Sequence, residues 1–147
     1  MSKTHRMFPA DARARAARLA LLAMHLARQE RYSEALARFD QAILLDPLCA
    51  ALHDARGVLL SLLRREQEAL ASFASAIALA RGEQEQALIY FHRGLLYGRR
   101  REYDQALLDM KRAERLDPAN QIYQEAVVQI RREKAREIGR ASCRERV

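Results

Sequence analysis

The sequence predicts an all-α protein built from three copies of a two-helix unit. A ladder of small and large apolar residues between Ala16 and Pro47 recurs twice further along the chain. Ala35 and Ala69, which hold the same place in the first two copies, are 34 residues apart, a period typical of helical repeat proteins. Residues that favour helices dominate the composition, and no strand-like alternation of apolar and polar residues occurs. We therefore expect stacked helix pairs and no sheet.

The expected helices begin and end at residues that suit those positions. Asp11 favours the start of the first helix, because an acidic side chain interacts well with the positive end of the helix dipole. Asp46-Pro47 ends the second helix, since a residue before Pro avoids the helical region. Gly82 is expected to end the fourth helix in a left-handed conformation, and Asn120 to cap the start of the last one. The helices are expected over residues 11–29, 32–45, 50–63, 66–80, 84–99, 103–116 and 121–136.

The three copies resemble the tetratricopeptide repeat (TPR) family. The resemblance rests on small residues, which let two helices approach closely, and on large residues that fill the space beside them: Ala23, Gly57, Gly94, Ala35, Ala69, Ala106, Leu26, Leu60, Tyr97, Phe39, Phe73 and Met110. It implies an α-α superhelix, a right-handed solenoid of three TPR-like helix-turn-helix repeats with a C-terminal capping helix. The repeats cover about residues 16–49, 50–83 and 87–120, and the capping helix covers about 121–136. Residues 1–10 are expected to form a flexible arm ahead of a TPR domain over 11–136.

The spacing of the copies is uneven. Ala69 and Ala106 are 37 residues apart, so three residues are inserted between the second and third copies. We expect the insertion around residues 83–86, close to the junction of the two copies.

The C-terminal segment Glu137–Val147 stands apart from the repeats. Back-translated in one frame, it matches a widely used sequencing adapter along its whole length. Our interpretation is an adapter artefact, and the alternative is an ordinary basic, disordered tail. In the first case the native chain departs from this sequence near Arg136, and whether it ends there or continues is left open.

The charge of the chain allows two readings. The net charge is +7 and the pI is about 10.0, which is typical of many nucleic-acid-binding proteins. However, only three of the 26 basic residues are Lys, and many Arg residues have acidic neighbours at helical spacing. We favour a solvated, Arg-rich surface. The two cysteines are too few for a disulfide framework, so a reducing, cytoplasmic location is expected.

By resemblance, the inner groove of the solenoid is lined by the first helix of each repeat. The expected groove residues recur at three- and four-residue steps and so form a stripe on each helix. They are Ala17, Ala20, Leu21, Met24, Arg28, Ala51, Asp54, Ala55, Val58, Leu62, Leu88, Phe91, His92, Leu95 and Arg99. Such an apolar groove suits a peptide or amphipathic helix from a protein partner. The alternative is self-filling, by the arm, by the capping helix or by a second copy in a homo-oligomer.

Some relatives hold a peptide's C-terminal carboxylates with Lys, Asn and Arg in this groove. At those places this chain carries Ala20, Met24, Ala55, Leu88 and His92. The carboxylate clamp is therefore absent, which argues against a receptor for acidic chaperone tails. The resemblance implies a non-catalytic interaction module, acting as a scaffold or a co-chaperone-like adaptor.

A second candidate surface is the edge formed by the turns inside the repeats. We call it the basic ridge, and its residues are Arg28, Arg31, Arg64, Arg65, Arg99, Arg100 and Arg101. It provides the alternative function, binding of nucleic acid or of an acidic protein. Interleaved Glu residues dilute the ridge, and no aromatic residues lie along it to stack on bases.

Arg56 and Arg93 occupy a position where the family usually has Leu. We expect Arg93 to pair with Asp109 on the partner helix. The alternative is that Arg93 extends to solvent with only its stem buried. In the second copy Ser72 replaces the acid, so Arg56 is expected to be held more loosely.

No enzyme chemistry is expected. The four His residues have no neighbours at metal-ligand spacing, and no phosphate loop or nucleophile motif occurs. His53 and Cys49 are interpreted as packing residues. The sequence therefore predicts neither a cofactor nor a metal.

Overall fold

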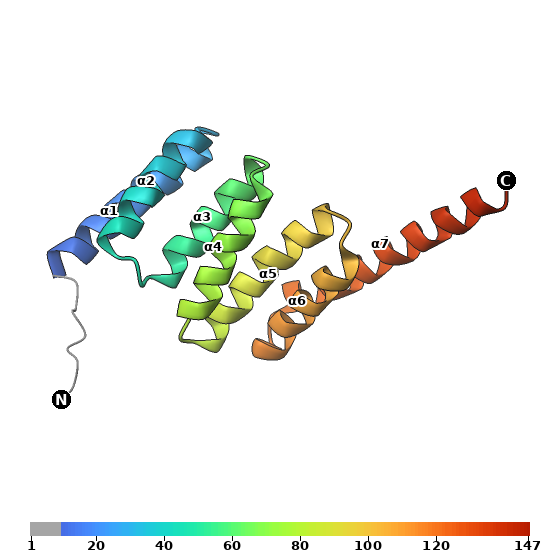
Figure 1. The fold of residues 1–147 in the computed structure, drawn as a ribbon. Coiled ribbons are helices and arrows are strands. Elements are labelled where there is room, and N and C mark those ends of the chain that lie inside the picture. The colour runs from blue at the N-terminus through green and yellow to red at the C-terminus, as the bar shows by residue number, and fades with distance from the viewer. Residues whose placement is uncertain (1–9) are drawn as a thin grey trace, which may run out of the picture. The chain divides into compact units, whose positions relative to one another are not determined.

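The computed structural model describes residues 10–147, and the expected arm lies outside the described residues apart from Ala10. This part of the chain contains seven helices and no strand (Figure 1). The helices are α1 (Ala10–Arg28), α2 (Tyr32–Leu45), α3 (Ala50–Leu62), α4 (Glu66–Leu79), α5 (Glu83–Arg99), α6 (Tyr103–Leu116) and α7 (Gln121–Glu145). The predicted all-α class is confirmed, and every helix except α7 lies within one residue of its expected ends.

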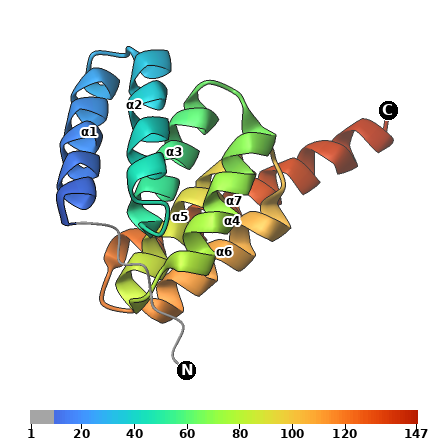
Figure 2. The same ribbon diagram turned by 60° about the vertical axis from the view of Figure 1, so that its left-hand side comes forward.

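The chain divides into two compact units. Unit 1 ends at Ala80 and contains the helix pairs α1–α2 and α3–α4, and unit 2 begins at Arg81 and contains α5–α7. In each pair the two helices run antiparallel and lie side by side (Figures 1 and 2). The pairs correspond to the three predicted repeats.

Close contact inside the second pair depends on Gly57. A Cβ atom built on Gly57 would lie 2.8 Å from two ring carbons of Phe73, which is closer than carbon atoms pack. Phe73 is almost fully buried, so its ring takes up the space that the glycine leaves. In unit 2 the same relationship holds between Gly94 and Met110 at 3.0 Å, with a flexible side chain in place of the ring.

The turns inside the three repeats share one backbone geometry. Glu30, Arg64 and Arg101 have φ values of 60°, 62° and 60°, in the left-handed region. Around each, the next residue donates its N–H to a carbonyl five residues back, as Arg31 does to Leu26 at 3.0 Å. This is the Schellman pattern, which usually places glycine at the left-handed position. Gly82 was expected to adopt that conformation, but its φ is −106° and it begins α5 instead, because the chain is extended there.

The residues inserted between the second and third repeats belong to helix α5. It has 17 residues, whereas α3 has 13, so the extra residues lengthen the helix by about one turn. The first turn contains Glu83 and Glu85, acidic residues that suit a helix N-terminus.

Helix α7 begins as expected and ends later than expected. Asn120 caps it, because the Asn120 side chain accepts a hydrogen bond from the Ile122 N–H at 3.1 Å. Tyr123, Val127 and Ile130 are its buried residues. The helix then continues past Arg136 to Glu145, so the expectation of a disordered tail is wrong. Residues 137–145 contain no Pro and a single Gly, and most of the others are good helix formers, so nothing in them stops the helix.

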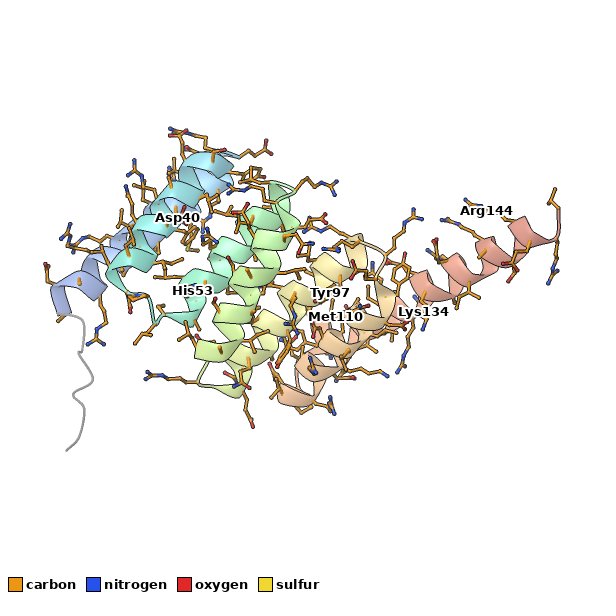
Figure 3. All side chains as sticks on the ribbon, viewed as in Figure 1. Asp40, His53, Tyr97, Met110, Lys134 and Arg144 are labelled. Atoms are coloured by element: carbon orange, nitrogen blue, oxygen red, sulfur yellow. The ribbon has the colours of Figure 1, made fainter. Side chains whose placement is uncertain are left out.

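The last part of α7 has no tertiary packing. Glu137 forms an ion pair at 3.4 Å with Arg101, which lies in the turn between α5 and α6. Every residue after Glu137 is exposed, and Figure 3 shows Arg144 on the part of α7 that extends away from α5 and α6. Among residues 10–147, no helix has the length and apolar character needed to cross a membrane.

Candidate functional site

Most of the predicted groove residues of unit 1 are exposed or half-buried. Leu21, Met24 and Leu62 are 67%, 47% and 46% exposed, which is high for large apolar side chains. The smaller or charged residues Ala17, Arg28 and Ala51 are exposed as well, and Ala20, Ala55 and Val58 are half-buried. The stripes of α1 and α3 therefore present apolar surface to solvent in unit 1.

Asp54 departs from the expected groove. We expected it to be an exposed polar residue, but it is only 7% exposed and has hydrogen-bonding or electrostatic interactions within the chain. The reason is its place on α3: Ala50, Gly57 and Ser61, four residues before and three and seven after it, are all buried. Asp54 shares their face of the helix, so it belongs to the packed side of α3.

In unit 2 the capping helix covers part of the predicted groove. The ring of Phe91 packs on the ring of Tyr123 from α7, with centroids 5.2 Å apart. Leu95 and Arg99 line a small cavity of about 180 Å³ together with Gln129 and Glu133 of α7. His92 is half-buried and Leu88 is exposed. Phe91 therefore packs against the capping helix, which is the contact that the self-filling alternative requires at this position.

The basic ridge is partly neutralised by ion pairs. Arg31 bonds to Glu34 at 2.6 Å and Arg65 to Glu68 at 2.7 Å, each bridging the start of a second helix. Arg100 bonds to Glu102, and Arg101 bonds to Glu137. Within the described residues, Arg28 and Arg64 make no ion pair, and Arg99 has interactions of its own. Much of the ridge charge is therefore balanced locally.

Arg93 and Asp109 lie where the sequence pattern suggested. Arg93 donates to both carboxylate oxygens of Asp109, from Nε at 2.7 Å and from Nη2 at 2.9 Å. The hydrogen bonding of Arg93 to the Asp109 carboxylate, which accepts, raises the pKa of Arg93. The guanidinium also lies 5.5 Å from the ring centre of Tyr90 and 5.9 Å from that of Tyr97. Figure 3 labels Tyr97 and Met110, which lie together between α5 and α6.

Arg56 has a partner that the sequence pattern did not reveal. Its Nη1 donates to Ser72 at 2.7 Å, as the register suggested, and its Nε donates to Asp40 of the preceding repeat at 2.7 Å. Its side chain is 26% exposed, against 19% for Arg93, so it is held nearly as firmly. These residues line a cavity of about 430 Å³ beside His53. A signal existed in the sequence, since Asp40 precedes Arg56 by 16 residues and Ser72 follows it by 16.

The His and Cys residues within 10–147 are not gathered into a candidate metal site. No group of three or more His, Cys, Asp or Glu side chains there is arranged to hold a metal ion. His53 is half-buried, with its Nε2 at 2.9 Å from the carbonyl oxygen of Pro47. Cys49 and Cys143 are free thiols.

Comparison with known proteins identifies the repeat. Residues 87–120 match the family model of the tetratricopeptide repeat, and these are the bounds expected for the third copy. The match contains all of α6, and α5 from residue 87 onward. The third repeat of this chain is thus similar to a tetratricopeptide repeat. No curated protein matches it along the sequence.

Solved TPR domains share the fold of this chain. The first TPR domain of Spaghetti (RPAP3), bound to the HSP90 peptide SRMEEVD, is 22% identical with a TM-score of 0.74, and the match covers 84% of this chain and 95% of that one. The first TPR domain of human RPAP3 is also 22% identical, with a TM-score of 0.76 and coverage of 85% and 96%. The Arabidopsis OM64 TPR domain is 18% identical, with a TM-score of 0.74 and coverage of 83% and 98%. These likenesses show that the chain has an all-α, TPR-like fold.

Proposed function

We propose that this chain is a non-catalytic adaptor that binds a peptide or an amphipathic helix of a protein partner on the apolar stripes of α1 and α3. The observation that supports the proposal is the exposure of Leu21, Met24 and Leu62 on predicted groove positions. Large apolar side chains gathered at exposed positions mark interaction surfaces more often than isolated ones do. An amphipathic helix would bury them with its own apolar face.

The comparisons support a peptide as the class of ligand. The Spaghetti TPR domain, which shares the fold, binds a peptide that ends in acidic residues. This chain carries Ala20, Met24 and Ala55 at positions where such relatives use polar or basic clamp residues. The proposed partner segment is therefore apolar on the face that docks and does not depend on a terminal carboxylate.

Selection from a library of displayed helical peptides tests the proposal. Peptides selected on the whole chain should bind the variants Leu21→Glu and Leu62→Glu at least tenfold more weakly, because a carboxylate would be buried against the peptide. Leu108→Glu is the matched control, since Leu108 is similarly exposed but lies on the second helix of its repeat. Equal loss in the control would show that the stripes are not the binding surface.

The alternative function uses the basic ridge to bind nucleic acid or an acidic protein. Arg28 and Arg64, the ridge residues without an ion pair in the described chain, carry this alternative. Ridge binding would weaken steeply as salt rises, whereas groove binding would change little. Roles as a scaffold, in self-association and in the cytoplasm stay predictions, the last from the low cysteine content.

A further inference from the structure

The cavity between α2 and α4, floored by α3, combines a fixed guanidinium with an aliphatic wall. It belongs wholly to unit 1 and measures about 430 Å³, within the size range of small-ligand pockets. Asp40 on α2 and His53 on α3 mark two of its sides in Figure 3. None of its residues belongs to the predicted groove or to the basic ridge.

Two hydrogen-bond donors on the polar side of the cavity remain available to a ligand. Arg56 uses Nε for Asp40 and Nη1 for Ser72, and its Nη2 group makes no hydrogen bond within the described residues. Ser72 accepts from Arg56, which leaves the Ser72 hydroxyl proton available. Ser72 is 4% exposed, so this donor is fixed in place. A guanidinium edge beside a hydroxyl matches the two oxygens of a carboxylate.

The rest of the cavity lining includes aliphatic side chains. Ile43 and Leu44 of α2 and Ala71 of α4 line it, and Leu44 is 80% exposed. A branched aliphatic group would cover Leu44 while its carboxylate met Arg56. The two halves together select for an aliphatic carboxylate over a sugar, a nucleotide or a bare anion.

We propose that this cavity binds a carboxylate attached to a branched aliphatic chain. The ligand carboxylate takes the Nη1–Nη2 edge of Arg56 and the Ser72 hydroxyl, and Asp40 keeps the Nε edge. Asp40 is 48% exposed and carries the opposing charge, so it weakens the site without closing it. This inference does not rest on the proposed peptide groove, because α1 contributes nothing to the cavity.

The third repeat differs from the second at two of the positions that line the cavity. At the positions of His53 and Ser75, 37 residues on, that repeat carries Tyr90 and Arg112. The guanidinium of Arg112 lies 5.3 Å from the ring centre of Tyr90, so two larger side chains in mutual contact occupy these positions on α5 and α6. Ser75→Arg should therefore close the cavity with a side chain that the fold already accommodates.

Nuclear magnetic resonance titration of the whole chain tests the site with small probes. Isocaproate should shift the Arg56 Nε–H and the Ser72 and Ser75 amide resonances, and isohexanol and isohexylamine should bind at least tenfold more weakly. The ligand could be a small free acid or the C-terminus of a peptide chain. Acetyl-Gly-Leu with a free carboxylate represents the chain terminus, and its amide is the control without the carboxylate. Binding of isocaproate alone indicates a small acid, and binding of both acids indicates a chain terminus. Equal binding of the amide or the alcohol would overturn the proposal, as would no binding by either acid.

Two variants make the test specific. Asp40→Asn removes the competing charge and should tighten isocaproate binding by roughly three- to tenfold. Ser75→Arg should abolish binding, and Ala74→Arg, which adds the same charge at an exposed neighbouring position outside the cavity, should not. Weaker binding by Asp40→Asn, or unchanged binding by Ser75→Arg, would overturn the proposal.

Discussion

Arg93 and Asp109 form a two-point salt bridge that joins α5 to α6 in the interior of unit 2. The Asp109 side chain is 2% exposed and the Arg93 side chain 19%. Arg112 adds a third, longer contact to Asp109 at 3.3 Å. Burial of a carboxylate is costly unless hydrogen bonds compensate for the lost water, and here three donors do so.

Removal of Asp109 should destabilise the fold. Asp109→Ala leaves the Arg93 guanidinium without its partner, and because Arg93 can still reach solvent we expect a loss of about 2–3 kcal/mol. The measurement is urea unfolding. Asp104→Ala is the matched control, since its bond to Lys134 is on the surface and worth less than about 1 kcal/mol. Equal losses in the two variants would contradict a structural role for the buried pair.

Gly57→Ala should destabilise the chain more than Gly94→Ala. Both changes gain up to about 1 kcal/mol of helix propensity. At Gly57 the new methyl group meets the ring of buried Phe73 at 2.8 Å, and we expect overpacking to cost about 1–3 kcal/mol. At Gly94 it meets the end of Met110, which can change rotamer. Thermal unfolding of the two variants should show this order, and the reverse order would show that the ring moves more easily than the thioether.

Arg64→Gly should stabilise the protein. Arg64 has a φ of 62°, which L-residues adopt at a cost of about 1 kcal/mol and glycine adopts freely. A rise in the free energy of unfolding of about 0.5–1 kcal/mol is expected. Arg65→Gly, at a φ of −88° next to it, should lower stability instead. A loss in both variants would mean that the Arg64 side chain has a stabilising role of its own.

The turn ion pairs should make a small, pH-dependent contribution to stability. A side-chain hydrogen bond from Arg31 lowers the pKa of Glu34, and one from Arg65 lowers the pKa of Glu68. Since both values fall on folding, the stabilisation is present above the ordinary Glu pKa of about 4.3 and is lost as the pH falls through the lowered values. Wild type should therefore melt above Glu34→Gln/Glu68→Gln at neutral pH, and the gap should close in acid. A gap that stays constant with pH would rule out the ion pairs as its cause.

Most of the fold could be read from the sequence, because it repeats a local pattern. The placement of Ala35, Ala69 and Ala106 fixed the helix pairs, and Asp46-Pro47 and Asn120 fixed helix ends through short-range backbone rules. The end of α7 could not be found in this way. No breaker follows Arg136, and an expectation based on the origin of the segment says nothing of its conformation.

The candidate surfaces were harder to predict, because they depend on contacts between repeats. Asp54 shares a buried face, and Phe91 is covered by Tyr123 from a helix that departs from the repeat pattern. Asp40 reaches Arg56 from the preceding repeat, so a comparison of equivalent positions inside one repeat misses it. The apolar stripe of Leu21 and Met24 on α1 was visible from spacing alone.

The measurement that tests the central proposal most directly is the affinity of one selected peptide for two single variants at low and high salt. Met24→Glu places a charge on the α1 stripe, and Arg64→Glu places on the ridge the residue that the first repeat carries at the same turn, Glu30. We predict a loss of at least tenfold for Met24→Glu, less than threefold for Arg64→Glu, and little change with salt. A large loss for Arg64→Glu together with steep salt dependence would contradict the groove and assign binding to the basic ridge.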